Sequence, residues 1–478
     1  MDVESAAPTT ASTPSFTRSL SGFGVVVLTL SVLSPGVSIF VSGGTILQQA
    51  GTGAISAFVL GALICYCQTS MIAELGSAYP TAGYDYAAIG YAVGDWAAGT
   101  TYMAGLLTAP LFLNTSAVGI AIYLRPLFPS LHEDLITYIT VAVCTGLAML
   151  NIRSSELITG LFLLIEVLAL LLVAGLGIMH VQPGIHELLT HPMTSNDGAW
   201  VGVGLGAMAL AGTNASWALS GASQALFFSE DMKRPQTIGR IIMLCFALTV
   251  LLETAPVIGT ILGSQHIRQV LAQDAPFADF MAQYLPDIGI KLVSLSIAIA
   301  IFNASLAGFI GIGRNFFAMG RTQLFNPGLN RALTLLIPKT DAPWFSLVLI
   351  GVTTGLATLL SMRFKVMMLA GNLTVISVFY IWGCLSGHRT GRTGRAGRHG
   401  YQTPWHPLIP IIGIVIVTGE FVAQWLDKDV GRPSILICLG LYGASFLYYW
   451  FVLMRRPHGW SMRGPQDIDA QAMPARGD

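Results

Sequence analysis

The sequence predicts an all-α integral membrane protein of about twelve transmembrane helices, and three observations carry this prediction. The chain has 478 residues, of which 53% are apolar and only 10% are charged, whereas soluble proteins carry about 25% charged residues. Its mean hydropathy is +0.67. Apolar runs long enough to cross a bilayer recur along the chain. Because 24 basic and 24 acidic residues cannot cover a chain of this length, most of its surface is expected to face lipid.

The same composition argues against several other classes of protein. Because the formal net charge is zero, the chain lacks the excess of basic residues that a nucleic-acid-binding surface requires. The chain contains no HExxH, CxxC or GxxxxGKS string, so zinc-enzyme and nucleotide-motor chemistry lack their residues. We therefore expect no cofactor, no metal and no nucleic-acid partner, and we expect the lipid bilayer as the surrounding medium.

Twelve apolar runs are predicted to be the transmembrane helices. The third and the eighth are long enough to tilt strongly or to extend beyond the bilayer. The runs cover residues 22–47, 53–76, 86–124, 134–151, 156–180, 200–229, 237–264, 288–320, 344–361, 366–387, 405–426 and 433–454.

The basic residues predict the orientation, because cytoplasmic loops are enriched in Lys and Arg. With both termini in the cytoplasm, 17 of the 24 basic residues fall inside and 7 outside. The arginine-rich loop at 389–404 is explained by this rule, although contact with lipid or RNA is an alternative. No basic n-region precedes the first run, so no cleavable signal is predicted. A plasma membrane or a bacterial inner membrane suits this arrangement.

Two of the runs are interrupted at matching positions. The first contains Ser34-Pro35-Gly36-Val37-Ser38, and the sixth contains Ser220-Gly221-Ala222-Ser223. Proline and glycine break helices, and unpaired backbone groups at membrane depth are tolerated only where they line a cavity or are buried in protein. Ordinary kinks are the alternative explanation.

The two interrupted runs lie five runs apart, as the first helices of two inverted five-helix repeats would. Such interruptions at corresponding positions indicate the binding site of a secondary transporter. Freed amides at a helix N-terminus suit a carboxylate, and freed carbonyls suit an ammonium group or a cation. An amino acid carries both groups.

Three segments resemble motifs of the amino acid–polyamine–organocation (APC) superfamily of permeases. Residues 73–86 are similar to its AELxxxYPxxGGxY stretch, residues 230–240 to its EExKNPxxxIPRA signature, and residues 314–321 to its RxxxAMARDG motif. The three occur in the expected order at the ends of the second, sixth and eighth runs.

The resemblance implies a leucine-transporter-like core of five plus five helices, with two peripheral helices. It divides the chain into a tail (1–20), a core (21–388) with repeats at about 21–181 and 199–388, a basic loop (389–404), two peripheral helices (405–455) and a second tail (456–478). It further implies transport of an amino acid or a related small amine by alternating access, with H⁺ or Na⁺ as coupling ion or by exchange. The oligomeric state is open.

The resemblance also assigns roles to individual residues. The first break would offer main-chain groups to the substrate, and the second break would face it across a cavity. Trp217 is a candidate aromatic gate, with a buried packing residue as the alternative. The substrate-binding candidates are Ser34, Pro35, Gly36, Val37, Ser38, Trp217, Ser220, Gly221 and Ser223.

The chain departs from the family pattern at both breaks. Gly36-Val37-Ser38 stands where Gly-Ser-Gly is usual, and Gly221-Ala222-Ser223 stands where Gly-Phe-Glu is usual. Because the acid of the second break is missing, a cationic substrate loses one expected partner. A neutral amino acid or a small amine is therefore favoured.

Charged residues inside the runs are candidates for ion coupling. Glu166 lies well inside the fifth run, where some similar permeases carry a lysine. Since low dielectric favours its neutral form, this carboxyl group is a candidate proton carrier. A structural acid is the alternative, and Glu253 and Glu420 compete for the role. For sodium coupling, Asn303 and Ser305 are the candidate ligands, although polar residues also join helices.

The charges at the predicted cytoplasmic side are candidates for an inside gate. They are Glu74, Asp85, Glu230, Asp231, Lys233 and Arg321. Solvated loop charge that serves topology is the alternative. At the level of the whole protein, the alternatives to a transporter are a transport-inactive membrane sensor and a membrane-embedded enzyme. The charges are scattered along the chain, which disfavours the enzyme.

Overall fold

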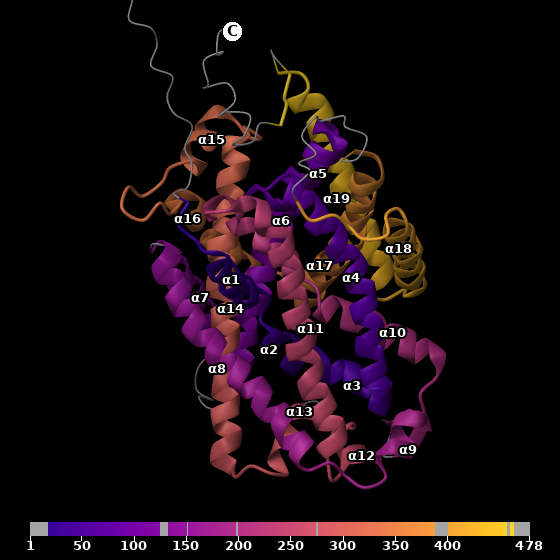
Figure 1. Ribbon diagram of the computed structural model, residues 1–478. Helices are drawn as coiled ribbons and strands as arrows, with labels where there is room; N and C mark the ends of the chain where they lie inside the picture. The colour runs from indigo at the N-terminus through magenta and orange to yellow at the C-terminus, as the bar shows by residue number, and fades with distance from the viewer. Residues whose placement is uncertain are drawn as a thin grey trace, which may run out of the picture.

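The computed structural model describes residues 18–124, 132–150, 152–196, 199–273, 276–387, 400–456 and 459–462. Most of these residues are helical (Figure 1). Within the described ranges the strands form one antiparallel hairpin, made of β1 (Met193–Asn196) and β2 (Ala199–Gly202). Of the segments predicted to flank the core, residues 1–17, 388–399, 457–458 and 463–478 lie outside the described part of the chain.

The helices of the first half follow the predicted apolar runs. They are α1 (Gly22–Leu33), α2 (Pro35–Val37), the π-helical η1 (Ser38–Gly43), α3 (Gly44–Ala50), α4 (Ala54–Ala78), α5 (Tyr84–Val93), α6 (Asp95–Leu124), α7 (Glu133–Leu147), α8 (Ile152–Met179) and the short α9 (Ile185–Thr190).

The second half follows its runs in the same way. Its helices are α10 (Leu205–Ala218), the 3₁₀ helix η3 (Ala222–Asp231), α11 (Ile238–Gly263), α12 (Ile267–Val270), α13 (Pro276–Ala282), α14 (Asp287–Arg321), α15 (Pro327–Leu333), α16 (Trp344–Leu356), α17 (Met362–Trp382), α18 (Leu408–Leu426) and α19 (Gly431–Tyr448).

Nine helical stretches of the described residues are long and apolar enough to cross a membrane. They overlap nine of the twelve predicted runs, namely the first, second, third, fifth, seventh, eighth, tenth, eleventh and twelfth. The fourth, sixth and ninth runs form the shorter helices α7, α10 with η3, and α16. The total of twelve spans therefore stays a prediction.

Two details of the predicted runs are wrong. The third was predicted as one helix over 86–124, but α5 ends at Val93 and α6 begins at Asp95. Gly94 between them has φ +133°, a conformation that only glycine adopts readily. The sixth was predicted to begin at 200, but its start belongs to β2, and α10 begins at Leu205.

Glycines allow the core helices to approach one another closely. A Cβ added at Gly177 of α8 would lie 1.9 Å from the Gly259 carbonyl oxygen of α11, and one added at Gly61 of α4 would lie 2.6 Å from the Ser216 nitrogen of α10. Small residues at such contacts let backbones pack directly, which is how membrane helices associate. The broken α1 lies among these helices and packs against α8, α11 and α14.

The two ends of the helical bundle differ in what they carry. Figure 1 shows α9, α12 and α13 at one end and α5 and α15 at the opposite end. In the most apolar windows of α18 and of the stretch that contains α19, 22% and 28% of residues are buried inside the protein, against 72% in the first stretch. The helices α18 and α19 therefore lie at the periphery, while α1 lies in the core.

Candidate functional site

The first break is a left-handed turn at a single residue. The helix α1 ends at Leu33, and Ser34 has φ +49° and ψ +84°. Pro35 then occupies the first turn of α2, where a missing N–H costs nothing, and the Ser34 hydroxyl accepts the Val37 amide at 3.4 Å. Ser34 thus ends one helix and caps the next. The chain continues through η1, whose wider turn keeps this segment irregular.

Glu166 of α8 reaches into this break. Its Oε1 atom accepts the Gly36 amide at 2.6 Å and the Ser34 hydroxyl at 2.9 Å. A Cβ at Gly36 would lie only 2.9 Å from the Glu166 Cγ atom, so glycine allows this approach. The carboxyl group occupies the amide end of α2, where an anion is favoured. The amide that the sequence assigns to a substrate carboxylate is therefore taken by the protein's own acid in this structure.

A second acid lies near the same break. Glu253 of α11 is fully buried, and neither of its carboxyl oxygens has a hydrogen-bond partner among the described residues. Glu166 is one of its electrostatic neighbours. Buried polar groups normally have partners, so this acid pair is an unusual feature of the core. The Ser38 hydroxyl donates to the Ala218 carbonyl at 3.2 Å and so connects the first break with the second.

The second break is made by glycine. The helix α10 ends at Ala218, and the Ser220 amide and hydroxyl both donate to the Trp217 carbonyl, at 3.2 and 2.7 Å. Gly221 has φ +117° and ψ −9°, which a side chain would strain. From Ala222 onward the chain is a 3₁₀ helix. The break is therefore caused by local sequence, because the turn at Ser220 and the positive φ of Gly221 together end the helix.

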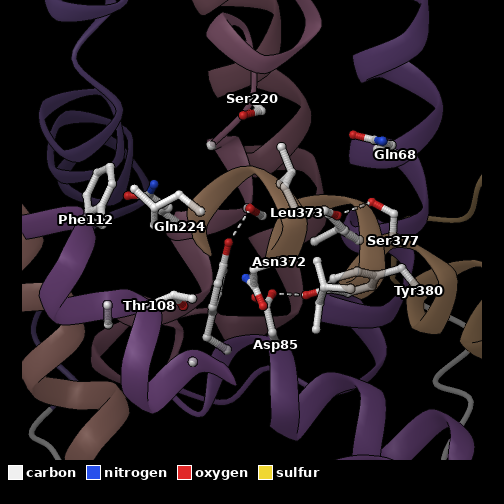
Figure 2. Close-up of a pocket in the computed structure, with 18 of the residues that line it drawn as sticks. Gln68, Asp85, Thr108, Phe112, Ser220, Gln224, Asn372, Leu373, Ser377 and Tyr380 are labelled. Atoms are coloured by element: carbon white, nitrogen blue, oxygen red, sulfur yellow. Dashed lines mark hydrogen bonds between the residues drawn. The ribbon is translucent and has the colours of Figure 1, made fainter. Parts of the chain in front are cut away.

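The two breaks meet at a cavity of about 270 Å³. Leu33 and Ser38 reach it from the first break, and the second break contributes several residues, Trp217 and Ser220 among them. Figure 2 shows Ser220 at one end of the cavity and Asp85 with Tyr380 at the opposite end. The walls between them come from α4, α6, α14 and α17. The cavity therefore has one end at the helix breaks, near Ser220, and a second, polar end at Asp85 and Tyr380.

Polar and aromatic side chains shape the second end. The Tyr380 hydroxyl of α17 donates to Asp85, and the hydroxyl groups of Tyr84 and Ser223 are hydrogen-bonded at 2.6 Å. The ring centroids of Tyr84 and Phe227 lie 4.4 Å apart. These contacts join α5, η3 and α17 around one space.

The comparisons with known proteins identify the family of the chain. The family model of amino acid permeases matches residues 20–453. The chain belongs to the amino acid permease family. This is the superfamily that the three sequence motifs resemble, and the prediction is confirmed. The human Asc-type amino acid transporter 1 is 28% identical over 207 residues, which are 41% of this chain and 39% of the human protein. The aligned part is thus about two fifths of the length of this relative.

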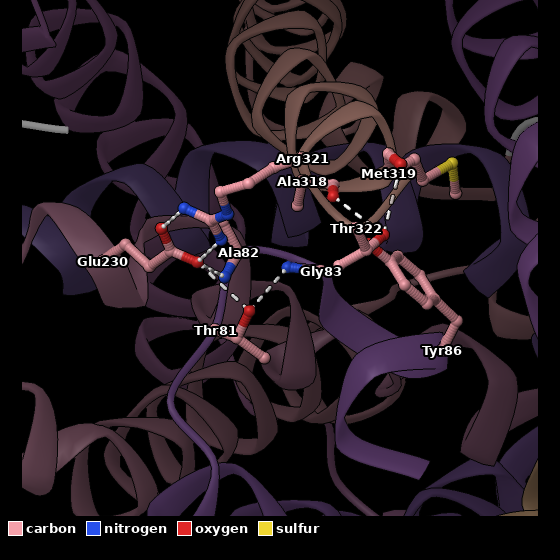
Figure 3. Close-up of polar contacts among 9 residues, drawn as sticks. All are labelled: Thr81, Ala82, Gly83, Tyr86, Glu230, Ala318, Met319, Arg321 and Thr322. Atoms are coloured by element: carbon pink, nitrogen blue, oxygen red, sulfur yellow. Dashed lines mark hydrogen bonds and ion pairs between the residues drawn. The ribbon is translucent and has the colours of Figure 1, made fainter. Parts of the chain in front are cut away.

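The three motifs of the permease meet at the end that carries α5. Figure 3 shows Glu230 of η3 facing Arg321 of α14, with Thr81 and Ala82 beside them. The Arg321 guanidinium donates to both Glu230 oxygens at 2.6 and 2.7 Å, and the Ala82 amide donates to one of them at 2.9 Å. The structure therefore joins the ends of α4, η3 and α14 through one carboxylate.

Burial and pairing act on this carboxylate in opposite directions. Burial alone would raise the pKa of Glu230, but the Arg321 guanidinium and the hydrogen bonds from Ala82 and Thr81 lower it below its ordinary value. Next to it, Asp231 accepts the Arg314 Nε at 2.6 Å. Both ion pairs are buried, which contradicts the alternative that these charges are solvated loop residues.

Other predicted gate residues of the permease lie elsewhere. Glu74 accepts the Thr403 amide at 3.0 Å, in the segment before α18. Asp85 faces the cavity and Tyr380. The structure therefore brings Glu230 and Arg321 together and leaves Glu74 and Asp85 in separate contacts. No ion pair of Lys233 is found among the described residues, although its amide donates to the Leu20 carbonyl at 3.0 Å.

Of the remaining predicted residues, some line the cavity and others do not. Trp217 is 47% exposed and lines the cavity, so it is not a buried packing residue. Asn303 is buried, and both atoms of its amide lack partners within the described chain. Ser305 donates to the Ile301 carbonyl of its own helix at 3.0 Å. Neither Asn303 nor Ser305, nor Ser34, Pro35, Gly36 and Val37, is among the described residues that line the cavity.

Sequence reasoning missed most of the cavity wall. The missed polar residues include Gln68, Thr108, Gln224, Asn315, Asn372, Ser377 and Tyr380. A signal exists for α17, because Asn372, Ile376 and Tyr380 recur at helical spacing and place one stripe on the cavity. The others are single polar residues in apolar runs, which does not distinguish them from ordinary helix contacts.

Proposed function

We propose that this permease is a secondary transporter that moves an amino acid or a related small amine by alternating access, coupled to protons or by exchange. The single observation that carries the proposal is the meeting of the two helix breaks at one cavity. Breaks of this kind supply main-chain groups to a substrate in transporters built from inverted repeats. A volume of about 270 Å³ has room for a molecule of several heavy atoms.

The proposal extends to the layout of the whole chain. Twelve spans, inverted repeats at about 21–181 and 199–388, and cytoplasmic termini in a plasma or bacterial inner membrane are all parts of it. The end that carries Glu230 and Arg321 is then the cytoplasmic end, and their ion pair closes it. The basic residues of the predicted inner loops support this orientation.

Glu166 is proposed as the proton-coupling group. Its Oε1 atom holds the first break through Ser34 and Gly36, while its Oε2 atom has no hydrogen-bond partner among the described residues. Protonation would weaken the acceptor that fixes the break, because a charged acceptor binds an amide more strongly than a neutral one. A change of protonation is thereby linked to the geometry of the cavity wall. For sodium coupling, Asn303 with its unpaired amide is the competing ligand.

The experiment is uptake into proteoliposomes under an imposed pH gradient in sodium-free buffer. A thermal-shift screen with amino acids and amines first selects the labelled probe, because a ligand stabilises the state that it binds. The parent is expected to accumulate the probe when the gradient is applied. Glu166→Gln is expected to lose this accumulation while it still exchanges probe across the membrane.

Glu420→Gln on the peripheral α18 is the matched control and is expected to behave as the parent. If Glu166→Gln accumulates probe as well as the parent, Glu166 is not the coupling group. If the parent binds probe but never accumulates or exchanges it, the sensor alternative replaces the transporter. A second arm applies a sodium gradient without a pH gradient. Accumulation in that arm alone moves the coupling site to Asn303, and Asn303→Leu tests it.

A further inference from the structure

The polar end of the cavity carries a charge that the proposed function does not use. Asp85 is the one charged side chain among the described residues that line the cavity. It lies at the N-terminus of α5, and the described chain forms no ion pair with it. Its carboxylate accepts the Tyr380 hydroxyl and faces the cavity, as Figure 2 shows. A partly buried carboxylate that faces a cavity, with no cation beside it among the described residues, is favourably placed to bind one.

Besides Asp85, two acceptors that line the cavity lack donors. The Asn315 Oδ1 and Gln224 Oε1 atoms are buried and have no hydrogen-bond partner within the described residues. Asn315 comes from α14 and Gln224 from η3, and both line the cavity. An unpaired buried acceptor is unfavourable. Two acceptors without donors and the Asp85 carboxylate, on three different elements, favour a ligand rich in N–H groups.

We propose that Asp85 is the specificity-determining residue of a cation subsite, and that it binds the distal ammonium or guanidinium group of an elongated substrate such as a basic amino acid or a diamine. The inference rests on the proposed transport function and names its substrate class. The substrate's other polar groups then lie toward Ser220 and Gly221, at the opposite end of the cavity. The acid that the second break lacks at Ser223 is thus supplied from α5, by a residue 138 positions earlier in the chain.

The environment of Asp85 makes the subsite sensitive to pH. Burial raises the pKa of Asp85 to about 7, although the hydrogen bond from Tyr380 acts in the opposite direction. The other titratable groups that interact with it are the tyrosines Tyr84 and Tyr442.

The acids on the elements packed against α5 have partners of their own, and none of them contributes to this pKa. Glu74 of α4 accepts the Thr403 amide, Asp95 of α6 accepts the Met462 amide, and Glu230 of η3 pairs with Arg321. Cation binding is therefore expected to follow the ionised fraction of Asp85 alone, which rises about tenfold from pH 6 to pH 8.

Paired ligands of equal length test the inference on the purified full-length permease. Arginine with citrulline and lysine with norleucine differ in the charge of the distal group, and putrescine adds a diamine. Their dissociation constants are measured by calorimetry at pH 8 and pH 6. The cationic member of a pair is expected to bind about tenfold to a hundredfold more tightly at pH 8, as a charge-assisted contact provides, and to lose most of this advantage at pH 6.

Asp85→Asn keeps the size of the side chain and is expected to reduce the cation preference to about one at both pH values. Asp95→Asn, the same substitution outside the cavity, is the control and keeps the preference. If the unaltered permease binds each cation no better than its neutral partner, or if Asp85→Asn keeps the preference, the subsite is refuted. Uptake of a neutral amino acid in that case leaves the transport proposal standing. If no amino acid or amine is bound or moved, the proposed function fails as well.

Discussion

The ion pair between Glu230 and Arg321 gives the most quantitative prediction. The two side chains are 8% and 2% exposed, and two N–O contacts of 2.6 and 2.7 Å join them. Exposed pairs contribute about 0.2–1 kcal/mol, whereas the loss of one partner of a buried pair costs about 3–5 kcal/mol. Because both side chains are almost fully buried, this pair belongs with the buried pairs. Arg321→Met leaves the carboxylate with the donors Thr81 and Ala82 only.

We therefore expect Arg321→Met to lower the free energy of unfolding by about 3–5 kcal/mol. The double variant Glu230→Gln/Arg321→Met is expected to recover most of this loss, because it leaves no buried charge behind. The assay is equilibrium unfolding in mixed micelles, with the exposed Arg268→Ala as control. A loss below about 1 kcal/mol for Arg321→Met, or an additive double variant, would refute the reasoning.

Three further predictions concern the breaks and the gate. Gly36→Ala places a Cβ 2.9 Å from the Glu166 Cγ atom. We therefore expect the free energy of unfolding in micelles to fall by about 1–3 kcal/mol and uptake to be slower. A variant that unfolds and transports like the parent would contradict this contact. Gly221→Ala forces φ +117° on a residue with a side chain, and we expect the free energy of unfolding to fall by about 1–3 kcal/mol. If the helix ran continuously through the break, this loss would not be observed. Because pairing with Arg321 lowers the pKa of Glu230, its stabilisation is present at neutral pH and lost as the pH falls through the folded-state pKa. Between pH 7 and pH 3 the free energy of unfolding should therefore fall less in Glu230→Gln than in the parent. If it fell equally in both proteins, the pairing would be contradicted.

Local chemistry made the two breaks predictable. A proline removes a backbone donor and a glycine weakens a helix, and both breaks lie where the sequence places them. The sequence also makes Glu166 a candidate for ion coupling, because an acid in an apolar run is costly and rare. Its bond to the Gly36 amide was not, since that contact depends on how α8 packs against α2.

The second end of the cavity depends on tertiary structure and was missed for that reason. Asp85 was assigned to the inside gate with Glu230 and Arg321, because all three were predicted to lie at the cytoplasmic side. The stop at Gly94 separates α5 from α6 and lets Asp85 face α17, where it meets Tyr380 nearly 300 residues later in the chain. No local pattern encodes such a contact.

The central claim is that the cavity between the two breaks holds the substrate during transport. The most direct measurement is thiol labelling of Ser220→Cys in a Cys65→Ser background, because Cys65 lines the same cavity and the other native cysteines are buried. Thr190→Cys, exposed on α9, is the control. A charged methanethiosulfonate reagent should block uptake by Ser220→Cys, saturating substrate should slow its labelling, and Thr190→Cys should label without either effect. Labelling of Ser220→Cys that substrate does not slow, or that leaves uptake intact, would contradict the account.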